Sequence, residues 1–239
     1  MTVFAACAIA SAALAVDSNV VGYNTVNVLA DEMTMVGINF EGLGTDAGLL
    51  DEVLSGNFCG GVNSASADTV LVWTPLGYQT YFYGYWNDPA WDYKWYDVDE
   101  NPADIVLKPG DAFWFRRYGA TTPLSVCGEV VVTNLVISVI ADDMTMFSNT
   151  HPIEIPVYDG LNVLNPTGGP NSASADTLFV WTPSGYQTYF CGYWNDPAWD
   201  YKWYDVDENP ATISLGIGQA AWYLRKGSAT TITFTAPAL

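Results

Sequence analysis

Histidine is nearly absent from this chain of 239 residues, which contains only one. That residue, His151, lies in the stretch Asn149-Thr150-His151-Pro152, and we expect it to be an exposed loop residue. Catalytic triads that use histidine as a base, and zinc sites that need several His or Cys ligands, are therefore not indicated. No glycine-rich phosphate loop follows a predicted strand and opens a helix. The sequence predicts a protein without catalytic activity.

Positive charge is also scarce. Seven Lys and Arg residues stand against 26 Asp and Glu residues, which gives a formal net charge of -19 at pH 7. Such a surface repels the phosphates of nucleic acids and of anionic lipids, so neither is predicted as a partner. A solvated acidic coat accounts for this charge, and cation binding is the alternative.

Long apolar runs are confined to the start of the chain. Residues 2–15, TVFAACAIASAALA, combine an apolar stretch with the small-x-small ending of a secretory signal. No Lys or Arg precedes residue 16, so we expect residues 1–15 to be a signal peptide that is truncated at its beginning. A membrane span needs about 20 apolar residues, and none is predicted. The sequence therefore predicts a secreted or cell-surface protein.

Cysteine is sparse as well. Of the four cysteines, Cys7 lies within the predicted signal and three others remain. Export permits disulfides. Cys59 and Cys127 both lie within residues 16–131, the first of two homologous copies, and the second copy lacks both, so we predict that they form a bridge. Cys191 is predicted to be a small buried hydrophobe.

The chain contains an internal duplication. Residues 63–103 and 171–211 are identical at all but four of 41 positions. We therefore divide the mature chain into two homologous copies, residues 16–131 and 132–239. No linker rich in Pro, Gly or Ser separates them, so we expect the junction GEVVVTNLVISVI to run through as strand and the copies to pack closely.

Short strands are predicted throughout. In the first copy, β-rich segments between turn signals cover residues 20–29, 33–40, 69–73, 78–86, 112–117 and 124–132. One short helix is expected within residues 45–54. Many short strands at short intervals are typical of sandwiches and barrels. The predicted fold class is all-β, with two tandem homologous β-sandwich-like or barrel-like modules.

Alternation along the strand at 112–117 separates two faces. Ala112 and Trp114 share one face, which we interpret as core. Phe113, Phe115 and Arg117 share the other, which we interpret as a second packed surface rather than an exposed platform.

Several segments carry a resemblance. SNVVGYNTV after a signal, SADTVLVWTP with GYQTYFYGYW, and PGDAFWFRR resemble a class of exported, uncharacterised β-rich repeat proteins of the verrucomicrobial–lentisphaeral bacterial type. The second copy departs from these motifs, with Ile217 in the place of Pro109 and Leu224 in the place of Arg116. The resemblance implies an exported surface or structural role and supplies no catalytic residues.

An acidic segment in each copy is a candidate calcium site, and calcium is the only cofactor that the sequence indicates. Alternating Asp, Asp and Asn residues can direct oxygen atoms at one hard cation, as at the start of a calcium-binding loop. The rest of such a loop is missing, because Pro102 stands where glycine is required. A solvated acidic loop is the alternative. The candidate ligands are Asp97, Asp99 and Asn101, with Asp205, Asp207 and Asn209 in the second copy.

An aromatic and acidic segment in each copy is a candidate sugar site. Indole rings stack on the apolar faces of sugars, and nearby carboxylates accept hydrogen bonds from hydroxyl groups. The alternative is that these rings cap the β core. The candidate residues are Trp86, Asp88, Trp91 and Trp95 in the first copy, and Trp194, Asp196, Trp199 and Trp203 in the second.

Together these patterns predict a non-catalytic structural or interaction protein of the cell envelope or extracellular matrix. Its expected partners are a glycan or an envelope component, or further copies of itself. The alternative is a carbohydrate-binding module that uses the aromatic-acidic loop of each copy. Exposed indoles in residues 86–96 would favour sugar binding, and buried ones the structural role.

Overall fold

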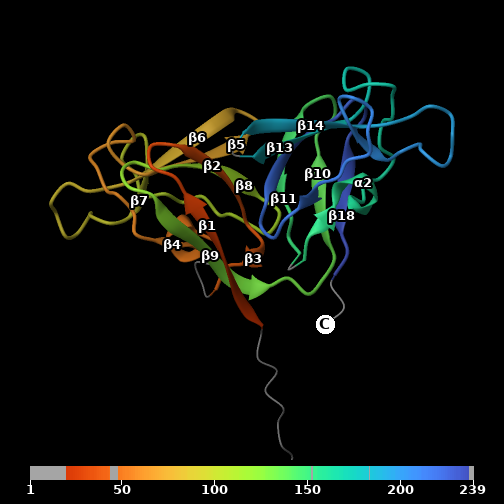
Figure 1. Ribbon diagram of the computed structural model, residues 1–239. Coiled ribbons are helices and arrows are strands. Elements are labelled where there is room, and N and C mark those ends of the chain that lie inside the picture. Colours follow the sequence, from red (N-terminus) through yellow and green to blue (C-terminus); the bar gives the residue numbers. More distant parts are fainter. Residues whose placement is uncertain (1–19, 44–47, 152, 183, 237–239) are drawn as a thin grey trace, which may run out of the picture.

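Figure 1 shows a computed structural model of the chain, which describes residues 20–43, 48–151, 153–182 and 184–236. The predicted signal peptide, residues 1–15, lies outside the described residues. Almost all regular structure is β-strand, so the predicted all-β, sandwich-like fold is confirmed. Neither short helix in the described ranges has the length or the apolar run needed to cross a bilayer.

The strands divide between two modules that follow each other along the chain. The first contains β1 (Val21–Val28), β2 (Met33–Gly37), β3 (Phe40–Glu41), α1 (Leu50–Val53), β4 (Leu54–Gly56), β5 (Thr69–Thr74), β6 (Gly77–Tyr83), β7 (Trp95–Asp97), β8 (Ala112–Arg116) and β9 (Thr122–Val130). The second contains β10 (Leu135–Val139), β11 (Met144–Ser148), β12 (Ile155–Pro156), α2 (Val157–Gly160), β13 (Thr177–Thr182), β14 (Gly185–Cys191), β15 (Trp203–Asp205), β16 (Ser214–Leu215), β17 (Ala220–Leu224) and β18 (Thr230–Phe234).

Each module contains a five-stranded antiparallel sheet with the same strand order. The order is β2-β8-β5-β6-β7 in the first module and β11-β17-β13-β14-β15 in the second. In the first module, β1, β9, β3 and β4 form the other layer of the sandwich. In the second, the pairs β10-β18 and β12-β16 take that place. Each module has its own hydrophobic core.

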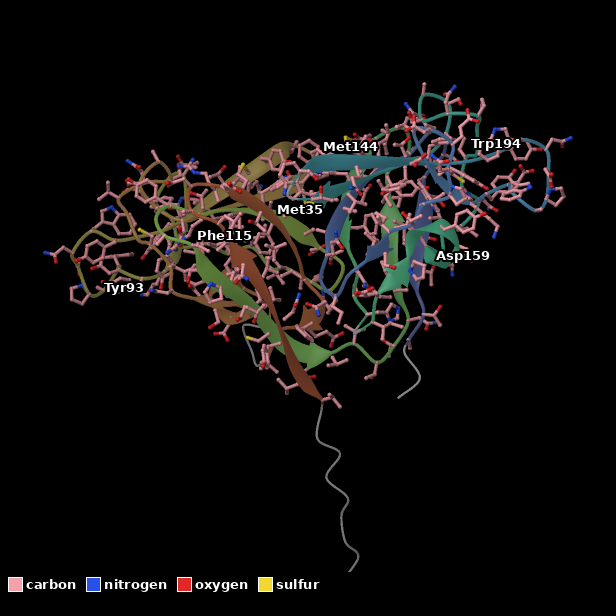
Figure 2. All side chains as sticks on the ribbon, viewed as in Figure 1. Met35, Tyr93, Phe115, Met144, Asp159 and Trp194 are labelled. Atoms are coloured by element: carbon pink, nitrogen blue, oxygen red, sulfur yellow. The ribbon has the colours of Figure 1, made fainter. Side chains whose placement is uncertain are left out.

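The outer faces of the two five-stranded sheets pack against each other and join the modules. The contact is a third hydrophobic cluster, in which Met35, Ala112 and Trp114 meet Met146, Ala220 and Trp222. Figure 2 places Met35 and Met144 in the middle of the molecule, where the modules meet. The sequence led us to expect close packing of the copies, and these side chains provide it.

The contacts between the modules are reciprocal. Trp73 meets Trp222 edge-on with 5.4 Å between ring centroids, and Trp181 meets Trp114 in the same way at 5.1 Å. The N–H of Gly37 donates to the carbonyl of Gly218 at 3.0 Å, and the equivalent N–H of Ser148 donates to the carbonyl of Gly110 at 2.9 Å. Each contact thus occurs twice with the modules exchanged, so an approximate two-fold axis relates them.

The interpretation of the β8 faces needs correction. Phe113 and Phe115 are fully buried and belong to the core of their own module. Ala112 and Trp114, the predicted core face, instead form part of the contact with the second module. Alternation along a strand separates its two faces, but both faces here are covered by apolar neighbours.

The junction between the copies also differs from the expectation. Strand β9 ends at Val130 and β10 begins at Leu135, so residues 131–134 are a short irregular connection and not continuous strand. The expected helix is present as α1, Leu50–Val53.

The predicted Cys59–Cys127 bridge is not formed, and both residues are free thiols. Antiparallel pairing places Gly56 opposite Leu124, so Cys59 lies beyond one end of the β4–β9 pair. The thiol of Cys127 instead lies 4.0 Å from the Glu52 carbonyl, at the other end of that pair. A disulfide needs Cα atoms within about 7 Å, which this arrangement does not provide. Cys191 is fully buried, as predicted.

We expect Trp114→Ala to lower the free energy of unfolding by about 3–5 kcal/mol, the usual cost of truncating a buried aromatic side chain. Trp114 is only 7% exposed and touches Trp181 of the other module. Denaturant titration followed by circular dichroism measures the loss. The control Leu76→Ala, at a position that is 96% exposed, should change stability by less than about 0.5 kcal/mol. Similar small changes in both variants would contradict a stabilising interface.

Candidate functional site

The connection between β6 and β7 is a loop built by its own acidic side chains. The Asp88 carboxylate accepts the N–H of Ala90 at 3.0 Å, and the Asp88 carbonyl accepts the N–H groups of Trp91 and Asp92. The Asp92 carboxylate reaches back to the N–H of Trp86 at 2.6 Å. The aspartate oxygens thus accept hydrogen bonds from backbone N–H groups that have no acceptor on a neighbouring strand. The loop is therefore held in one shape without regular secondary structure.

Backbone hydrogen bonds at Gly84 join the two ends of the loop. Its N–H donates to the carbonyl of Lys94 at 2.8 Å, and its carbonyl accepts the N–H of Tyr93 at 2.9 Å. A Cβ atom at Gly84 would lie 2.3 Å from the Trp86 ring, so only glycine allows the indole to lie there. The same ring meets Tyr96 edge-on, with centroids 4.8 Å apart. Trp86 is thus fixed between the loop base and β7.

The loop forms a cleft with a volume of about 320 Å³, lined by Trp86, Asp88, Trp91, Tyr96 and Glu100. The Trp91 side chain is 53% exposed. The backbone carbonyl of Trp91 accepts the Tyr96 hydroxyl at 2.5 Å, which holds the backbone at this position. The cleft therefore combines an exposed indole with carboxylates, the groups that contact the apolar faces and the hydroxyl groups of a sugar.

The second module repeats this loop. The ring of Trp194 meets that of Tyr204 edge-on, with 4.6 Å between centroids. The backbone N–H of Trp194 donates to the Asp200 carboxylate at 2.7 Å. The Tyr204 hydroxyl donates to the carbonyl of Trp199 at 2.7 Å. Trp199 is 51% exposed, close to the value for Trp91. The two tracts, which are nearly identical in sequence, therefore also expose equivalent tryptophans to the same extent.

Exposed tyrosines beside the loop were missed by the sequence reasoning. Tyr93 is 61% exposed, and its ring lies 5.4 Å from that of Tyr85. Tyr201 and Tyr193 repeat the pair at 5.3 Å. Tyr93 and Tyr201 have φ values of 63° and 59°, a conformation that is unusual for bulky side chains. Such strain often accompanies binding sites. The signal in the sequence was the run of tyrosines on both sides of the tryptophans.

Two predicted sugar-binding residues need correction. Trp95 and Trp203 are only 1% and 3% exposed. They begin β7 and β15 and point into the cores of their modules, where Trp95 packs against Phe115 and Trp203 against Tyr223. Their rings are inaccessible to a ligand, because strand alternation turns them away from the loop that precedes them. Of the predicted set, Trp86, Asp88 and Trp91 line the first cleft, and their equivalents in the second loop are Trp194, Asp196 and Trp199.

The predicted calcium ligands do not converge on a cation site. The Asp97 carboxylate accepts the N–H of Asp99 at 2.9 Å and that of Asn101 at 2.8 Å. The side-chain nitrogen of Asn101 also points at this carboxylate, at 3.1 Å. A calcium ligand must present oxygen, so this orientation is the reverse of what binding requires.

The acidic segment of the second module has the same arrangement, in which Asp205 accepts hydrogen bonds from Asp207 and Asn209. Within the described residues, no group of three or more His, Cys, Asp or Glu side chains could hold a metal ion. Both segments are thus turns stabilised by an aspartate.

The expectation for His151 is also wrong. The residue is only 8% exposed, and its ring lies 5.7 Å from that of Phe234. Burial lowers the pKa of this imidazole below its usual value, which favours the neutral form. His151 closes one end of the second core.

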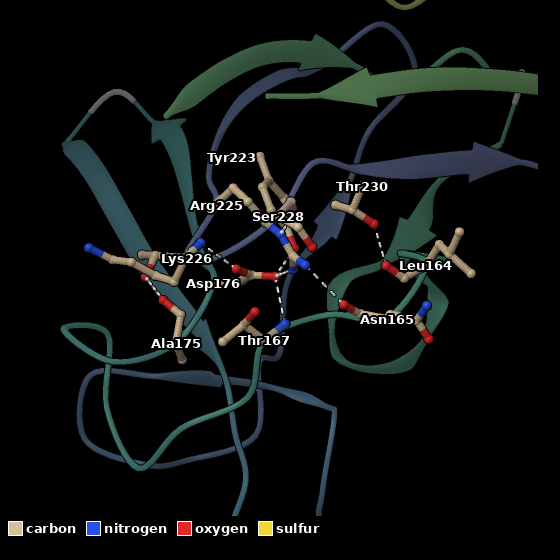
Figure 3. A network of polar contacts seen from close by, with 11 residues as sticks. Leu164, Asn165, Thr167, Ala175, Asp176, Tyr223, Arg225, Lys226, Ser228 and Thr230 are labelled. Atoms are coloured by element: carbon tan, nitrogen blue, oxygen red, sulfur yellow. Dashed lines mark hydrogen bonds and ion pairs between the residues drawn. The ribbon is translucent and has the colours of Figure 1, made fainter. Parts of the chain in front are cut away.

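A buried ion pair supports the base of each loop. In the second module, the Asp176 carboxylate accepts bonds from Arg225 at 2.5 Å and from the N–H groups of Thr167 and Lys226 at 2.8 and 2.7 Å (Figure 3). The backbone carbonyl of Asp176 accepts the N–H of Cys191, the last residue of β14. The network therefore fixes the end of β14, where the loop between β14 and β15 starts.

The first module has the same network with one bond fewer. Asp68 is paired with Arg117 and accepts the N–H groups of Cys59 and Tyr118, and its carbonyl accepts the N–H of Tyr83. In the second module, the carboxylate also accepts the Tyr223 hydroxyl at 2.6 Å. Phe115 occupies that place in the first module, where no hydroxyl is available.

Comparison of the chain with family models, with curated proteins and with solved structures gives no match.

We expect Tyr223→Phe to lower the free energy of unfolding by about 1–3 kcal/mol, because a buried carboxylate loses one charge-assisted hydrogen bond. Tyr189→Phe is the matched control, since its hydroxyl donates to the part-exposed Gln187 side chain at 2.9 Å. The Tyr189→Phe variant should lose less unfolding free energy than the Tyr223→Phe variant. Denaturant unfolding of the two variants at equal concentration makes the comparison, and equal losses would contradict the importance of the buried bond.

We expect Asp97→Ala to be less stable than the wild type at pH 7, with a difference that shrinks as the pH falls. Burial raises the pKa of the Asp97 carboxyl, but the hydrogen bonds from Asn101 and Asp99 outweigh burial and bring it below the usual value. A lowered pKa contributes stability above the unfolded-state value of about 3.9, and this contribution is lost as the carboxyl becomes protonated.

Urea unfolding of the Asp97→Ala variant at pH 7, 5 and 3 tests this pH dependence. Asp99→Ala serves as the control, because Asp99 supplies its backbone N–H to the turn. A difference between wild type and Asp97→Ala that stays constant down to pH 3 would argue against the stated cause.

Proposed function

We propose that the chain is a non-catalytic glycan-binding protein with one aromatic-acidic cleft in each module. The observation that carries this proposal is the cleft of the first module together with the same loop in the second, where Trp91 and Trp199 are 53% and 51% exposed and their backbone carbonyls are bound in the same way. The loop of the second module is taken as the second cleft. Flat aromatic surfaces of this kind stack on the apolar faces of pyranose rings. Asp88 and Glu100 at the first cleft supply acceptors for hydroxyl groups.

The charge of the chain indicates which glycans fit. A net charge of -19 repels polysaccharides that contain sulfate or uronic acid groups. The cleft itself carries the carboxylates of Asp88 and Glu100, with no basic side chain among its lining residues. The proposed ligand is therefore a neutral pyranose polysaccharide with equatorial hydroxyl groups, because such sugars present flat apolar faces to an indole.

The acidic residues of the loop support binding rather than hydrolysis. One Asp88 oxygen accepts the N–H of Ala90, and one Asp92 oxygen accepts the N–H of Trp86. Asp92 is only 9% exposed, so it is shielded from a ligand in the cleft. These carboxylates shape the loop, and a glycosidase would need two that flank a scissile bond. The apolar start of the chain supports an extracellular setting for this binding.

A second candidate function is self-association, as expected of a structural protein of the envelope or matrix. It is favoured by β1, which is an edge strand of its sheet and eight residues long. Val21 and Tyr23 on this strand are 58% and 78% exposed. Long edge strands with exposed apolar side chains pair readily with other chains. Light scattering from the purified protein across a concentration series tests this second candidate.

We expect Trp91→Ala and Trp199→Ala each to remove one binding site and the double variant to remove both. Loss of an aromatic stacking surface corresponds to about a tenfold or greater loss of affinity at that site. Affinity electrophoresis in gels containing neutral polysaccharides (hydroxyethyl cellulose, galactomannan, arabinoxylan and glycol chitin) measures the retardation of each variant.

Leu76→Ala is the control for these experiments, because Leu76 is 96% exposed and lies in the turn between β5 and β6, outside both loops and outside β1. It should migrate like the wild type. The proposal is contradicted if no polysaccharide retards the wild type, or if the double variant is retarded as strongly as the wild type.

A further inference from the structure

We propose that the two clefts bind separate glycan chains, so that one protein molecule bridges two polysaccharides. This inference rests on the proposed function. It concerns the arrangement of the clefts relative to each other, which follows from the way the two modules are joined.

The module interface lies at the beginning of β6. Tyr78, the second residue of this strand, meets Trp73 with ring centroids 5.0 Å apart. Trp73 in turn meets Trp222 of the second module. In the second module, Tyr186 near the start of β14 meets both Trp181 of its own module and Trp114 of the first. Both strands therefore start where the modules touch.

The cleft of the first module and the equivalent loop of the second lie at the opposite ends of the same strands. Phe82 near the end of β6 contacts Trp86, and Phe190 near the end of β14 contacts Trp194. A seven-residue strand spans about 20 Å, so each cleft lies roughly that far from the interface. Figure 2 shows the result, with Tyr93 at one outer end of the molecule and Trp194 at the other.

The two clefts keep this separation because the modules are packed together. The interface is an apolar cluster with reciprocal tryptophan contacts and backbone hydrogen bonds. The connection between β9 and β10 is only residues 131–134. The loops therefore cannot turn toward each other to approach one short ligand.

The approximate two-fold axis argues against a single chain filling both clefts. A polysaccharide has a direction, from its reducing end to its non-reducing end. A two-fold axis reverses direction, so a straight chain that enters one cleft in the preferred orientation meets the other cleft in the opposite orientation. Two separate chains satisfy both clefts equally. A protein with two outward sites gains avidity by joining chains.

The test uses the full protein with the same four neutral polysaccharides, mixed in solution at a fixed protein concentration and increasing polymer concentration. We expect light scattering from the wild type to rise and then fall as excess polymer leaves each molecule with one chain per site. Trp91→Ala and Trp199→Ala should still be retarded in the gels, but their maximal scattering should be at least tenfold lower. Leu76→Ala, at an exposed position outside both loops and outside β1, should scatter like the wild type.

The outcomes separate this inference from the proposed function. If the wild type is retarded by a polysaccharide but its scattering does not rise, bridging is wrong and glycan binding stands. If either single-site variant scatters as strongly as the wild type, bridging through the two clefts is also wrong. If no polysaccharide retards the wild type, both proposals fail together.

Discussion

The packing of two aromatic sheet faces against each other is the constraint on which the arrangement of this molecule depends. Each five-stranded sheet presents tryptophan and methionine side chains on the face that points away from its own core. Left in water, a face of this kind would be a large apolar patch. Pairing the two faces buries the centre of both patches at once, while Tyr78 and Tyr186 stay partly exposed at the rim. It also sets the approximate two-fold relation that points the loops in opposite directions.

The same sheets hold the loops at their far ends. A buried carboxylate in each module, Asp68 or Asp176, is paired with an arginine and fixes the strand end where the aromatic loop begins. An unpaired carboxylate at this depth would be costly, and the arginine and backbone donors offset part of that cost. The exposed indoles and the tyrosines with positive φ therefore project from a loop whose first strand end is held by buried hydrogen bonds.

Much of the fold followed from local patterns in the sequence. Strands β1, β2, β5, β6, β8 and β9 lie within or close to the segments predicted from alternation and turn residues. Strands β4 and β7 were missed, because three residues are too few to show alternation. The loops were found as candidate sites because their residue types are repeated. Trp95 was misplaced among them, since it lies just beyond the loop and enters the core.

The sequence by itself determined the extended backbone, the duplication and the aromatic loops, because each depends on neighbouring residues or on comparison of one tract with another. The tertiary structure alone decided what covers each sheet face, which indoles remain accessible, and that Cys59 and Cys127 lie apart. It also turned the predicted calcium ligands toward backbone donors. These features depend on contacts between residues far apart in the chain, and a local pattern carries no information about them.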